Sequence, residues 1–210
     1  MGLFITFEGG EGSGKTFQAK ALYRKLLETG VQVLLTHEPG GTEAGEKISH
    51  LLKQSKEIEM SPLTELLLFN ASRAQLIEEV LQPSLKAGEV VICDRYTDSA
   101  IAYQSFGRGL DIELVRSINN TATQGVMPNL TILLDMPPEE GFIRIKRREK
   151  DRFEQEDMAF HKRIRDGFLS LAADEPGRWL VVDATWSKER IRTLIWKKVN
   201  RILAEKEMIK

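Results

Sequence analysis

The glycine-rich stretch Gly9–Thr16, which reads GGEGSGKT, restricts the possible folds more than any other feature of the chain. It satisfies the G-x-x-x-x-G-K-[ST] pattern of a phosphate-binding loop. Glycines allow the backbone to turn successive N–H groups inward, which makes a concave site for an anion. The apolar run Leu3–Glu8 precedes the loop and an amphipathic stretch follows it. The sequence therefore predicts a nucleotide phosphate site between a buried strand and a helix.

Each residue type in this loop has a chemical reason. The helix that follows adds its free N–H groups and the positive end of its dipole. Lys15 can reach the β- and γ-phosphates, and the hydroxyl of Thr16 can bind Mg²⁺. The residues predicted to bind ATP are Gly10, Glu11, Gly12, Ser13, Gly14, Lys15 and Thr16. Neither the guanine-specifying Asn-Lys-x-Asp of GTPases nor the Leu-Ser-Gly-Gly-Gln of ABC ATPases occurs, which favours phosphotransfer to a small molecule.

Short apolar runs alternate with longer amphipathic ones along the chain, as is typical of β-α units and a parallel sheet. The predicted strands are Leu3–Glu8, Val31–Thr36, Val90–Asp94, Leu130–Asp135 and Trp179–Asp183. The predicted helices are Lys15–Glu28, a segment from Ser61-Pro62 towards Pro83, and residues 111–124, 137–149, 156–173 and 187–206. We expect one α/β domain over residues 1–210, a three-layer fold with a five-stranded parallel sheet flanked by helices.

Composition restricts the partners and the cellular compartment that we expect for the protein. The net charge of −1 gives no reason to expect a nucleic-acid partner, and no apolar run approaches the ~20 residues needed to span a bilayer. The single cysteine, Cys93, excludes an intramolecular disulfide and fits a reducing compartment. Gly2 and Thr6 match a short myristoylation pattern, but Leu3–Phe7 is better explained as a core strand. We expect a cytoplasmic protein.

A second group of functional side chains follows the predicted strand Val90–Asp94. Asp94 stands at the carboxyl end of that strand, where it can hold Mg²⁺ beside the phosphate loop. The adjacent Arg95 can clamp a phosphate with two hydrogen bonds. A purely structural ion pair at a strand end is the alternative for these two residues.

The chain resembles the bacterial thymidylate kinases along nearly its whole length. The matching pieces are Gly9–Thr16, Glu38–Thr42, Phe69 with Arg73, Asp94-Arg95-Tyr96, Ser99, Ala102-Tyr103-Gln104, Gly107-Arg108-Gly109 and Asp151–Glu154. The resemblance implies the P-loop kinase fold, with a helical lid at about residues 141–156. It also implies transfer of the γ-phosphoryl group of ATP to dTMP, giving dTDP and ADP in dTTP synthesis for DNA replication.

The resemblance also implies a dTMP site. Phe69 would stack on thymine, and Arg73, four residues later on the same helix face, would donate to its O4. Tyr103 would leave no room for a ribose 2′-hydroxyl, and Glu11 would accept from the 3′-hydroxyl. The dTMP-binding residues implied are Glu11, Glu38, Pro39, Phe69, Arg73, Arg95, Ser99, Tyr103 and Gln104. From the residues alone, Phe69 reads as core packing. An acid beside the ATP phosphates is repulsive, so Glu11 needs a functional reason, and a structural role such as accepting from loop amides is the alternative.

The stretch from Arg144 to Arg152 carries six basic residues among nine. Alone it reads equally as the solvated end of a helix or a nucleic-acid patch. The resemblance makes it the lid, whose arginines stabilise the charge of the transferred group. Because the phosphate loop has no arginine, the implied catalytic residues are Lys15, Arg95, Arg147, Arg148 and Arg152. Arg144 would stack on adenine, and Ala184 would contact it through backbone groups.

Three positions depart from the pattern of the family. His37 replaces an arginine before Glu38, Phe17 replaces a small hydroxyl residue after Thr16, and Ala100 replaces a hydroxyl residue after Ser99. These changes bear on individual substrate contacts and leave the expected fold and reaction class intact.

Two alternatives stay open from sequence. One is another P-loop kinase, acting on a deoxynucleoside, dCMP or dGMP. The other is a nucleotide-dependent switch that hydrolyses ATP slowly without an acceptor. The resemblance favours ATP and dTMP as small-molecule substrates with Mg²⁺ as cofactor, no nucleic-acid or membrane partner, and a homodimer.

Overall fold

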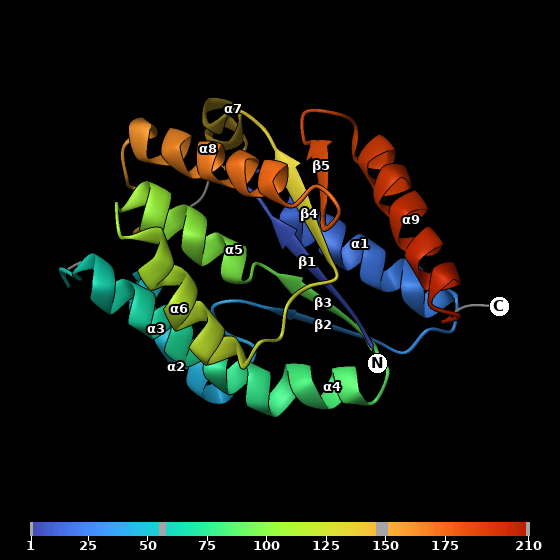
Figure 1. Cartoon of the computed structure of the whole chain (residues 1–210). Coiled ribbons are helices and arrows are strands. Elements are labelled where there is room, and N and C mark those ends of the chain that lie inside the picture. Colours follow the sequence, from blue (N-terminus) through green and yellow to red (C-terminus); the bar gives the residue numbers. More distant parts are fainter. Residues whose placement is uncertain (1, 55–57, 146–150, 209–210) are drawn as a thin grey trace.

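A parallel sheet with strand order β2-β3-β1-β4-β5 forms the centre of the molecule (Figure 1). The computed structural model describes residues 2–54, 58–145 and 151–208. The strands are β1 (Leu3–Glu8), β2 (Val33–His37), β3 (Val90–Asp94), β4 (Leu130–Asp135) and β5 (Trp179–Asp183). All neighbouring pairs are parallel, so the predicted five-stranded parallel α/β sheet is confirmed.

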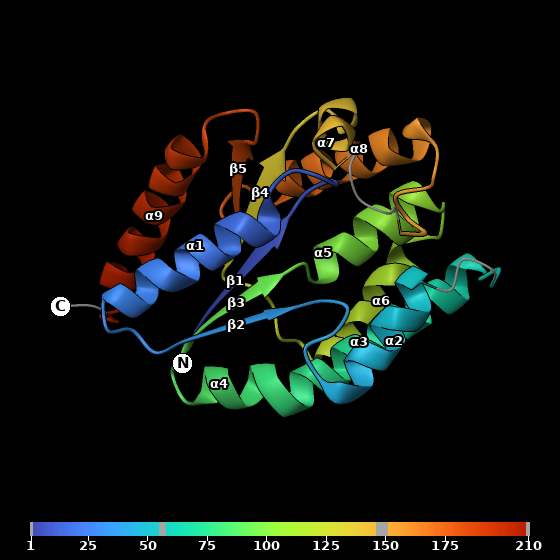
Figure 2. The same cartoon turned by 180° about the vertical axis from the view of Figure 1, so that it is seen from behind.

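Helices cover both faces of this sheet (Figures 1 and 2). One face carries α1 (Lys15–Glu28) and α9 (Lys188–Glu205). On the other side lie α2 (Glu43–Gln54), α3 (Pro62–Leu76), η1 (Ile77–Leu81), α4 (Gln82–Lys86), α5 (Thr97–Ala100), η2 (Ile101–Gly107), α6 (Ile112–Thr123) and α8 (Met158–Asp174). The short helix α7 (Pro138–Ile145) follows β4. Within the described residues, no helix has the length and apolarity needed to cross a membrane.

Strand β1 is buried along its whole length because its side chains alternate between the two helical layers. Leu3, Ile5 and Phe7 join the apolar cluster formed with α1 and α9. Phe4 faces the opposite way and packs with residues of η1 and α4. Each of these side chains contributes about 1.5–3 kcal/mol on full burial. The central strand therefore anchors the phosphate loop that leaves its carboxyl end.

Capping residues explain why several helices begin where they do. The hydroxyl of Ser61 accepts from the Thr64 N–H, and Pro62 supplies the first residue of α3. Asp111 and Asp157 accept from N–H groups three residues on, at the starts of α6 and α8. The first helix differs, because Gly14 at its N-cap has a φ of 92° and no capping side chain. The N–H groups of its first turn therefore remain free to bind an anion in the phosphate loop.

The helix predicted from Ser61-Pro62 towards Pro83 extends further than expected. Proline usually ends a helix, because it lacks an N–H and its ring meets the carbonyl four residues back. Here α3 widens into the π-helical η1, in which the Gln82 N–H bonds to the Ile77 carbonyl. The wider turn accommodates Pro83 near the start of α4, which runs to Lys86.

Two helical segments were not among the predicted elements. Helix α2 begins after Thr42, whose hydroxyl accepts from the Gly45 N–H at 3.0 Å. The pair α5 and η2 covers 97–107, a stretch recognised in the sequence only as a series of site residues. Strand β2 also begins two residues later than predicted, at Val33 instead of Val31.

The register of the sheet places the strand ends in one row. Phe7 pairs with Asp94, and His37 lies beside Asp94 on the other side. Since β1 lies between β3 and β4, the connections leave the sheet in opposite directions at its carboxyl end. That change of direction is where open α/β sheets bind ligands.

Candidate active site

A cavity of about 830 Å³ opens at the carboxyl ends of the central strands. Its walls come from the phosphate loop, the ends of β2 and β3, helix α3, the α5–η2 segment and the segment around α7. Of the residues predicted from sequence, those that line it are Glu11, Gly12, Gly14, Lys15, Thr16, Glu38, Pro39, Phe69, Arg73, Asp94, Arg95, Ser99, Tyr103, Gln104 and Arg144. A volume of this size lies in the upper part of the range found for small-molecule sites.

The side chain of Lys15 curls back into the phosphate loop. Its Nζ donates to the carbonyl oxygens of Gly9 at 3.0 Å and Gly10 at 2.8 Å. Burial and the nearby Arg95 lower the pKa of Lys15 to about 8, although Glu11 acts in the opposite direction. An anion in the loop would replace the two carbonyls as its partner and favour the charged amine.

Two oxygen ligands meet at the helical side of the loop. The Thr16 hydroxyl donates to Oδ2 of Asp94 at 2.5 Å, which joins the start of α1 to the end of β3. Hydroxyl and carboxylate oxygens suit Mg²⁺, which in phosphotransfer sites takes one or two protein ligands and completes its shell with phosphate oxygens and water. No cluster of three acidic, His or Cys side chains is found among the described residues, so any metal here would depend on substrate oxygens.

Arg95 projects into the cavity from a backbone conformation that non-glycine residues rarely adopt, with φ of 73°. Its N–H bonds to the Phe7 carbonyl, which fixes the turn after β3. One terminal nitrogen, Nη1, donates to the Gly9 carbonyl at 3.2 Å and the Ser99 hydroxyl at 3.1 Å. The other, Nη2, donates to Glu11 at 2.7 Å. The guanidinium thus lies beside the phosphate loop, and a strained turn holds it there.

Glu11 carries a full negative charge inside the phosphate loop. Burial alone would raise the pKa of this carboxyl, but Arg95 and Lys15 lower it to about 2. The Tyr103 hydroxyl also donates to Glu11, at 2.7 Å. Glu11 therefore acts as an acceptor for cations and hydroxyl groups, and the repulsion expected between an acid and phosphates is offset by its two cationic neighbours.

Glu8 was not predicted as a functional residue, yet it supports the turn that carries Arg95. The carboxyl accepts from the N–H groups of Tyr96 at 2.8 Å and Ser99 at 3.3 Å. Burial and the neighbouring Asp98 raise the pKa of Glu8 to about 8, although Arg95 opposes the shift. Glu8 is therefore a neutral acid through most of the physiological range.

The raised pKa of Glu8 predicts a specific pH dependence of stability. Between pH 4.5 and about 8 the folded chain keeps a proton that the unfolded chain has released. The contribution is therefore complete below pH 4.5 and declines as the pH rises towards 8. We expect Glu8→Gln, which cannot ionise, to remove a downward slope of up to about 1.4 kcal/mol per pH unit.

Urea denaturation of both proteins from pH 5 to 8 measures this difference. Glu28→Gln, on the exposed end of α1, serves as the control and should follow the wild-type curve. Parallel curves for wild type and Glu8→Gln would contradict a raised pKa at this position.

Arg73 and Glu38 form a buried ion pair deep in the cavity. Nη2 of Arg73 lies 2.6 Å from Oε2 of Glu38, and Nε also donates to that carboxylate. Nη1 donates to Asn70 at 3.0 Å and to Asn119 at 2.8 Å. Burial raises the pKa of Glu38, while Arg73 lowers it. Among the described residues, four of the five guanidinium N–H groups thus have partners, which leaves one on Nη2.

Phe69 and Gln104 complete this end of the cavity. The ring of Phe69 lies 5.7 Å from that of Phe153, centroid to centroid, and remains partly accessible. Gln104 is buried and donates through Nε2 to Glu65 at 2.9 Å. Tyr103 packs edge-on against Phe153, and its ring lies under the guanidinium of Arg95. An apolar slot bounded by a few oriented polar groups results, as in sites for flat heterocycles.

The basic segment lies only partly within the described residues. Arg144, in the last turn of α7, lines the cavity and donates to the Ala184 carbonyl at 3.0 Å, which brings those two predicted residues together. Arg147 and Arg148 lie outside the described residues. Arg152 is not brought to the cavity wall, because its Nη2 pairs with Glu65 at 2.6 Å. Of the predicted catalytic residues that the structure describes, Lys15 and Arg95 line the cavity together, and Arg152 does not.

The departures from the family pattern have structural consequences. His37 pairs with Glu46 at 3.1 Å at the start of α2. Phe17 lines the cavity mouth, half exposed, with Lys188 4.7 Å from its ring centroid. Ala100 is buried and lines the cavity without a polar group.

Sequence reasoning missed two further charged residues near the cavity. Lys53 lines the wall from the end of α2, and Glu65 is buried in α3 beneath Gln104. The capping signal at Thr42 could have revealed α2 and with it Lys53. A lone glutamate on an amphipathic helix gives no comparable signal for Glu65.

A phosphate loop after the central strand of a parallel sheet, facing a second cation and an apolar slot, defines a P-loop nucleotide kinase. Residues 7–195 match the family model described as Thymidylate kinase. The chain belongs to the thymidylate kinase family.

Similar proteins support this assignment across the whole chain. The thymidylate kinase of Dehalococcoides mccartyi is 53% identical over 203 residues, covering 97% of this chain and 98% of its own length. That of Deinococcus radiodurans is 49% identical over 201 residues, covering 95% and 97%. The crystal structure of thymidylate kinase from Ehrlichia chaffeensis superposes with a TM-score of 0.78 at 36% identity, covering 94% of this chain and 98% of that one.

Proposed function

We propose that this chain transfers the γ-phosphoryl group of ATP to dTMP, giving ADP and dTDP for dTTP synthesis. The observation that carries the proposal is the continuity of the cavity from Lys15 in the phosphate loop, past Arg95, to the slot at Phe69 and Arg73. A nucleotide phosphate cradle and a slot for a flat base thus share one space. This arrangement suits a reaction between two nucleotides better than hydrolysis of one.

In the proposed reaction an oxygen of the dTMP phosphate attacks the γ-phosphorus in line with the leaving group. One P–O bond forms as the bond between the γ-phosphorus and the β,γ-bridging oxygen breaks, and ADP leaves with that electron pair. No covalent enzyme intermediate is needed. Lys15 would leave the Gly9 and Gly10 carbonyls to bind the β- and γ-phosphates, and Arg95 would hold the acceptor phosphate. Catalysis then consists of positioning and charge stabilisation.

Thr16 and Asp94 are the residues we propose to hold Mg²⁺ as the cofactor, directly or through water. When bound, the ion would neutralise negative charge on the phosphates. Their present hydrogen bond shows that the two oxygens already lie close together, as a shared ligand requires.

The dTMP contacts proposed here follow from the same cavity. Phe69 would stack on the base, and the remaining Nη2 hydrogen of Arg73 would donate to its O4. Tyr103, held by Glu11, would pack against the sugar where a ribose would carry its 2′-hydroxyl. Glu11 would accept from the 3′-hydroxyl. Glu38, Pro39, Ser99 and Gln104 complete the proposed set.

The ATP side relies on the loop and the basic segment. Gly10, Gly12, Ser13 and Gly14 would supply backbone N–H groups to the phosphates, and Arg144 with Ala184 would contact adenine. Arg147 and Arg148 would supply positive charge to the transferred group. Arg152 would act with them only after leaving Glu65, so we propose an indirect role for it below.

A coupled assay of ADP release tests the proposed function. Mg-ATP is supplied with dTMP, dUMP, dCMP, dGMP, ribosylthymine monophosphate or thymidine in turn, and with no acceptor. We expect fast ADP release with dTMP and weak release with the ribose analogue. A preference for thymidine, dCMP or dGMP would point to a different kinase, and equal release without an acceptor would point to an ATP-hydrolysing switch.

We also propose that the chain, acting as a single kinase domain, forms a homodimer in a reducing compartment, the cytoplasm. Exposed leucines support the dimer: Leu63 and Leu67 lie one turn apart on α3, and Leu114 is exposed on α6, which packs against α3. Isolated exposed leucines are ordinary, whereas two on one helix face are a candidate contact surface. The buried thiol of Cys93 fits the compartment.

Leu67→Glu should convert the dimer to a monomer of 23.8 kDa, because it places a charge in the middle of the proposed contact. Light scattering after size exclusion measures the mass. Leu27→Glu is a matched control, since Leu27 and Leu67 are each 49% exposed and Leu27 lies on α1, across the sheet. A wild-type mass of one chain, or a dimer that survives Leu67→Glu, would exclude this interface.

A further inference from the structure

Glu65 is a buried carboxylate to which the reaction proposed above gives no task. It is 1% exposed, lies in α3 one turn before Phe69 and does not line the cavity. Gln104 donates to its Oε1 at 2.9 Å. Arg108 donates to both oxygens, to Oε1 at 3.3 Å and to Oε2 at 3.2 Å, and Arg152 donates to Oε2 at 2.6 Å. A buried acid with this many donors is held in one orientation.

The bond to Glu65 decides which end of the Gln104 amide faces the cavity. A carboxylate flanked by two arginines can only accept hydrogen bonds, so Gln104 must present its NH₂ group to it. The reversed amide would set two oxygen acceptors against each other. Oε1 of Gln104 is therefore directed away from Glu65. Within the described part of the chain this buried oxygen accepts no hydrogen bond, although the residue lines the cavity.

An unpaired buried acceptor calls for a ligand that donates an N–H group. Arg73 supplies the complementary feature, one Nη2 hydrogen without a partner among the described residues. A donor and an acceptor lining the same slot match an imide edge, a carbonyl next to an N–H, as in thymine or uracil. Cytosine offers the reverse, an amino group next to a ring acceptor, and would meet Arg73 donor to donor and Gln104 acceptor to acceptor.

We propose that Glu65 is a positioning residue for base selection, which fixes the Gln104 amide so that its oxygen accepts the N3–H of the substrate base. The proposal rests on the proposed function and assigns Glu65 a part in it. Glu65 touches no substrate. It acts through Gln104, and its effect lies in the choice between an imide base and cytosine.

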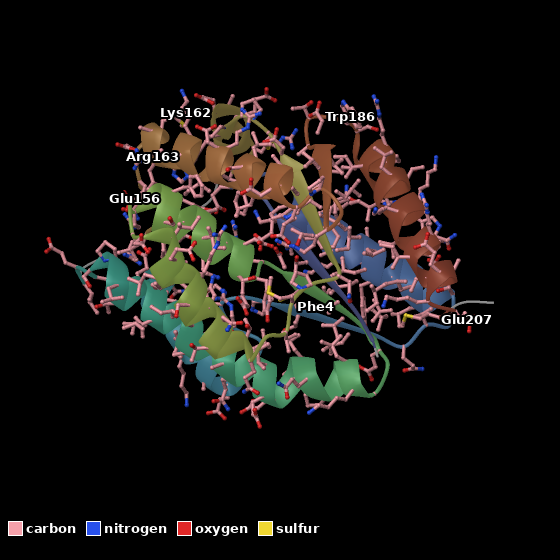
Figure 3. The ribbon with its side chains drawn as sticks, in the orientation of Figure 1. Phe4, Glu156, Lys162, Arg163, Trp186 and Glu207 are labelled. Carbon is pink, nitrogen blue, oxygen red and sulfur yellow. The ribbon has the colours of Figure 1, made fainter. Side chains whose placement is uncertain are left out.

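The two arginines that hold Glu65 extend this arrangement to the segment after α7. Arg152 also donates to the Leu52 carbonyl through Nε at 3.1 Å, which ties it to the end of α2. Arg108 reaches Glu156 with Nη1 at 2.6 Å, just before α8, where Figure 3 labels Glu156. Both cations keep Glu65 an acceptor. Arg152, the last residue of the basic segment, thus supports the base slot through Glu65.

Glu65→Gln is the decisive variant because it keeps the shape and removes one acceptor. Arg108 and Arg152 can only donate and both reach the Oε2 position, so the oxygen of the new amide stays there. Its NH₂ then faces Gln104, and the 3.3 Å bond from Arg108 Nε to the Oε1 position is lost. Gln104 would then reverse and present NH₂ to the cavity. We expect kcat/KM for dTMP to fall about tenfold, mainly through KM, and kcat/KM for dCMP to stay level or rise. KM for ATP should stay within about twofold.

A double-mutant cycle with Gln104→Leu separates this role from a structural one. If Glu65 acts through Gln104, adding Glu65→Gln to Gln104→Leu should change kcat/KM for dTMP by less than about twofold. A full tenfold loss on that background would overturn the proposal. So would an equal loss for dTMP and dCMP accompanied by a higher KM for ATP. Glu113→Gln, at an exposed pair on α6, should leave every parameter unchanged.

Glu65→Asp provides a second approach should Glu65→Gln fail to fold. It keeps the charge for both arginines but withdraws the carboxylate from Gln104 by about one bond length. The same rise in KM for dTMP, absent on the Gln104→Leu background, supports the proposal, and an unchanged KM overturns it. If the wild-type enzyme phosphorylates dTMP and both Glu65 variants discriminate against dCMP as well as it does, only the role of Glu65 is excluded. A wild-type enzyme inactive on dTMP overturns the proposed function as well.

Discussion

Arg73→Met should lower the free energy of unfolding by about 3–5 kcal/mol at neutral pH, because it leaves a buried carboxylate without its partner. Glu38 loses three short contacts to the guanidinium, and Asn70 and Asn119 each lose a donor. Methionine fills much of the same volume, so the loss reflects charge and hydrogen bonding more than a cavity. Urea denaturation at pH 7 measures it.

The size of this loss should depend on pH. Burial already raises the pKa of Glu38 against the opposing effect of Arg73, so removing Arg73 raises that pKa further. A folded-state pKa above the unfolded value means that stability is greatest where the acid is protonated and falls as the pH rises. We therefore expect Arg73→Met to be less destabilised at pH 5 than at pH 8.

Two further variants decide whether the buried pair is the cause. Glu38→Gln combined with Arg73→Met should recover part of the stability, since no uncompensated charge remains. Arg116→Met, which breaks an exposed pair with Glu113, should change stability by no more than about 0.5 kcal/mol. A loss at Arg73 that is independent of pH and unrelieved by Glu38→Gln would mean that packing, not charge, dominates at this position.

The elements that the sequence predicted well are those in which local and global preferences agree. The buried strands Leu3–Glu8 and Leu130–Asp135 have continuous apolar runs, and their bounds coincide with the structure. The Ser61-Pro62 start of α3 follows from a capping hydroxyl and a proline that needs no N–H partner. At Pro83 the rule that proline ends a helix failed, because a π-helical stretch allowed the helix to continue past the proline.

The predicted site residues at the strand ends and in the phosphate loop came together because of the parallel register of the sheet. Parallel register alone brings Asp94 beside Phe7, two residues before the phosphate loop begins at Gly9. Side chains such as Arg152 could not be placed in this way, because a long basic side chain can reach several partners. Its pairing with Glu65 depends on how α3 and the segment before α8 pack against each other. The spacing of residues along the chain does not predict that packing.

The largest effect on catalysis from a residue outside the proposed substrate contacts should come from Gly141→Ala. A Cβ atom on Gly141 would lie well inside van der Waals distance of the Glu11 carbonyl oxygen, and one on Gly12 would meet the Gly141 carbonyl in the same way. The base of α7 and the phosphate loop therefore touch backbone to backbone. Backbone atoms cannot rotate away from an added methyl group as a flexible side chain would. In Gly141→Ala, either the phosphate loop or α7 must therefore shift as a whole.

We expect Gly141→Ala to reduce kcat/KM for ATP by about 100-fold, because a shift of about 1 Å in the loop misplaces Lys15 and a shift of α7 misplaces Arg144. The stability cost should be about 1–3 kcal/mol, so the variant should remain folded. Steady-state kinetics and thermal unfolding measure the two effects. Gly177→Ala is the matched control, since a Cβ there meets nothing within 4 Å and the backbone has no positive φ. Activity within twofold of wild type in Gly141→Ala would show that α7 can move away from the loop without disturbing the phosphate site, and that their close contact does not position the nucleotide.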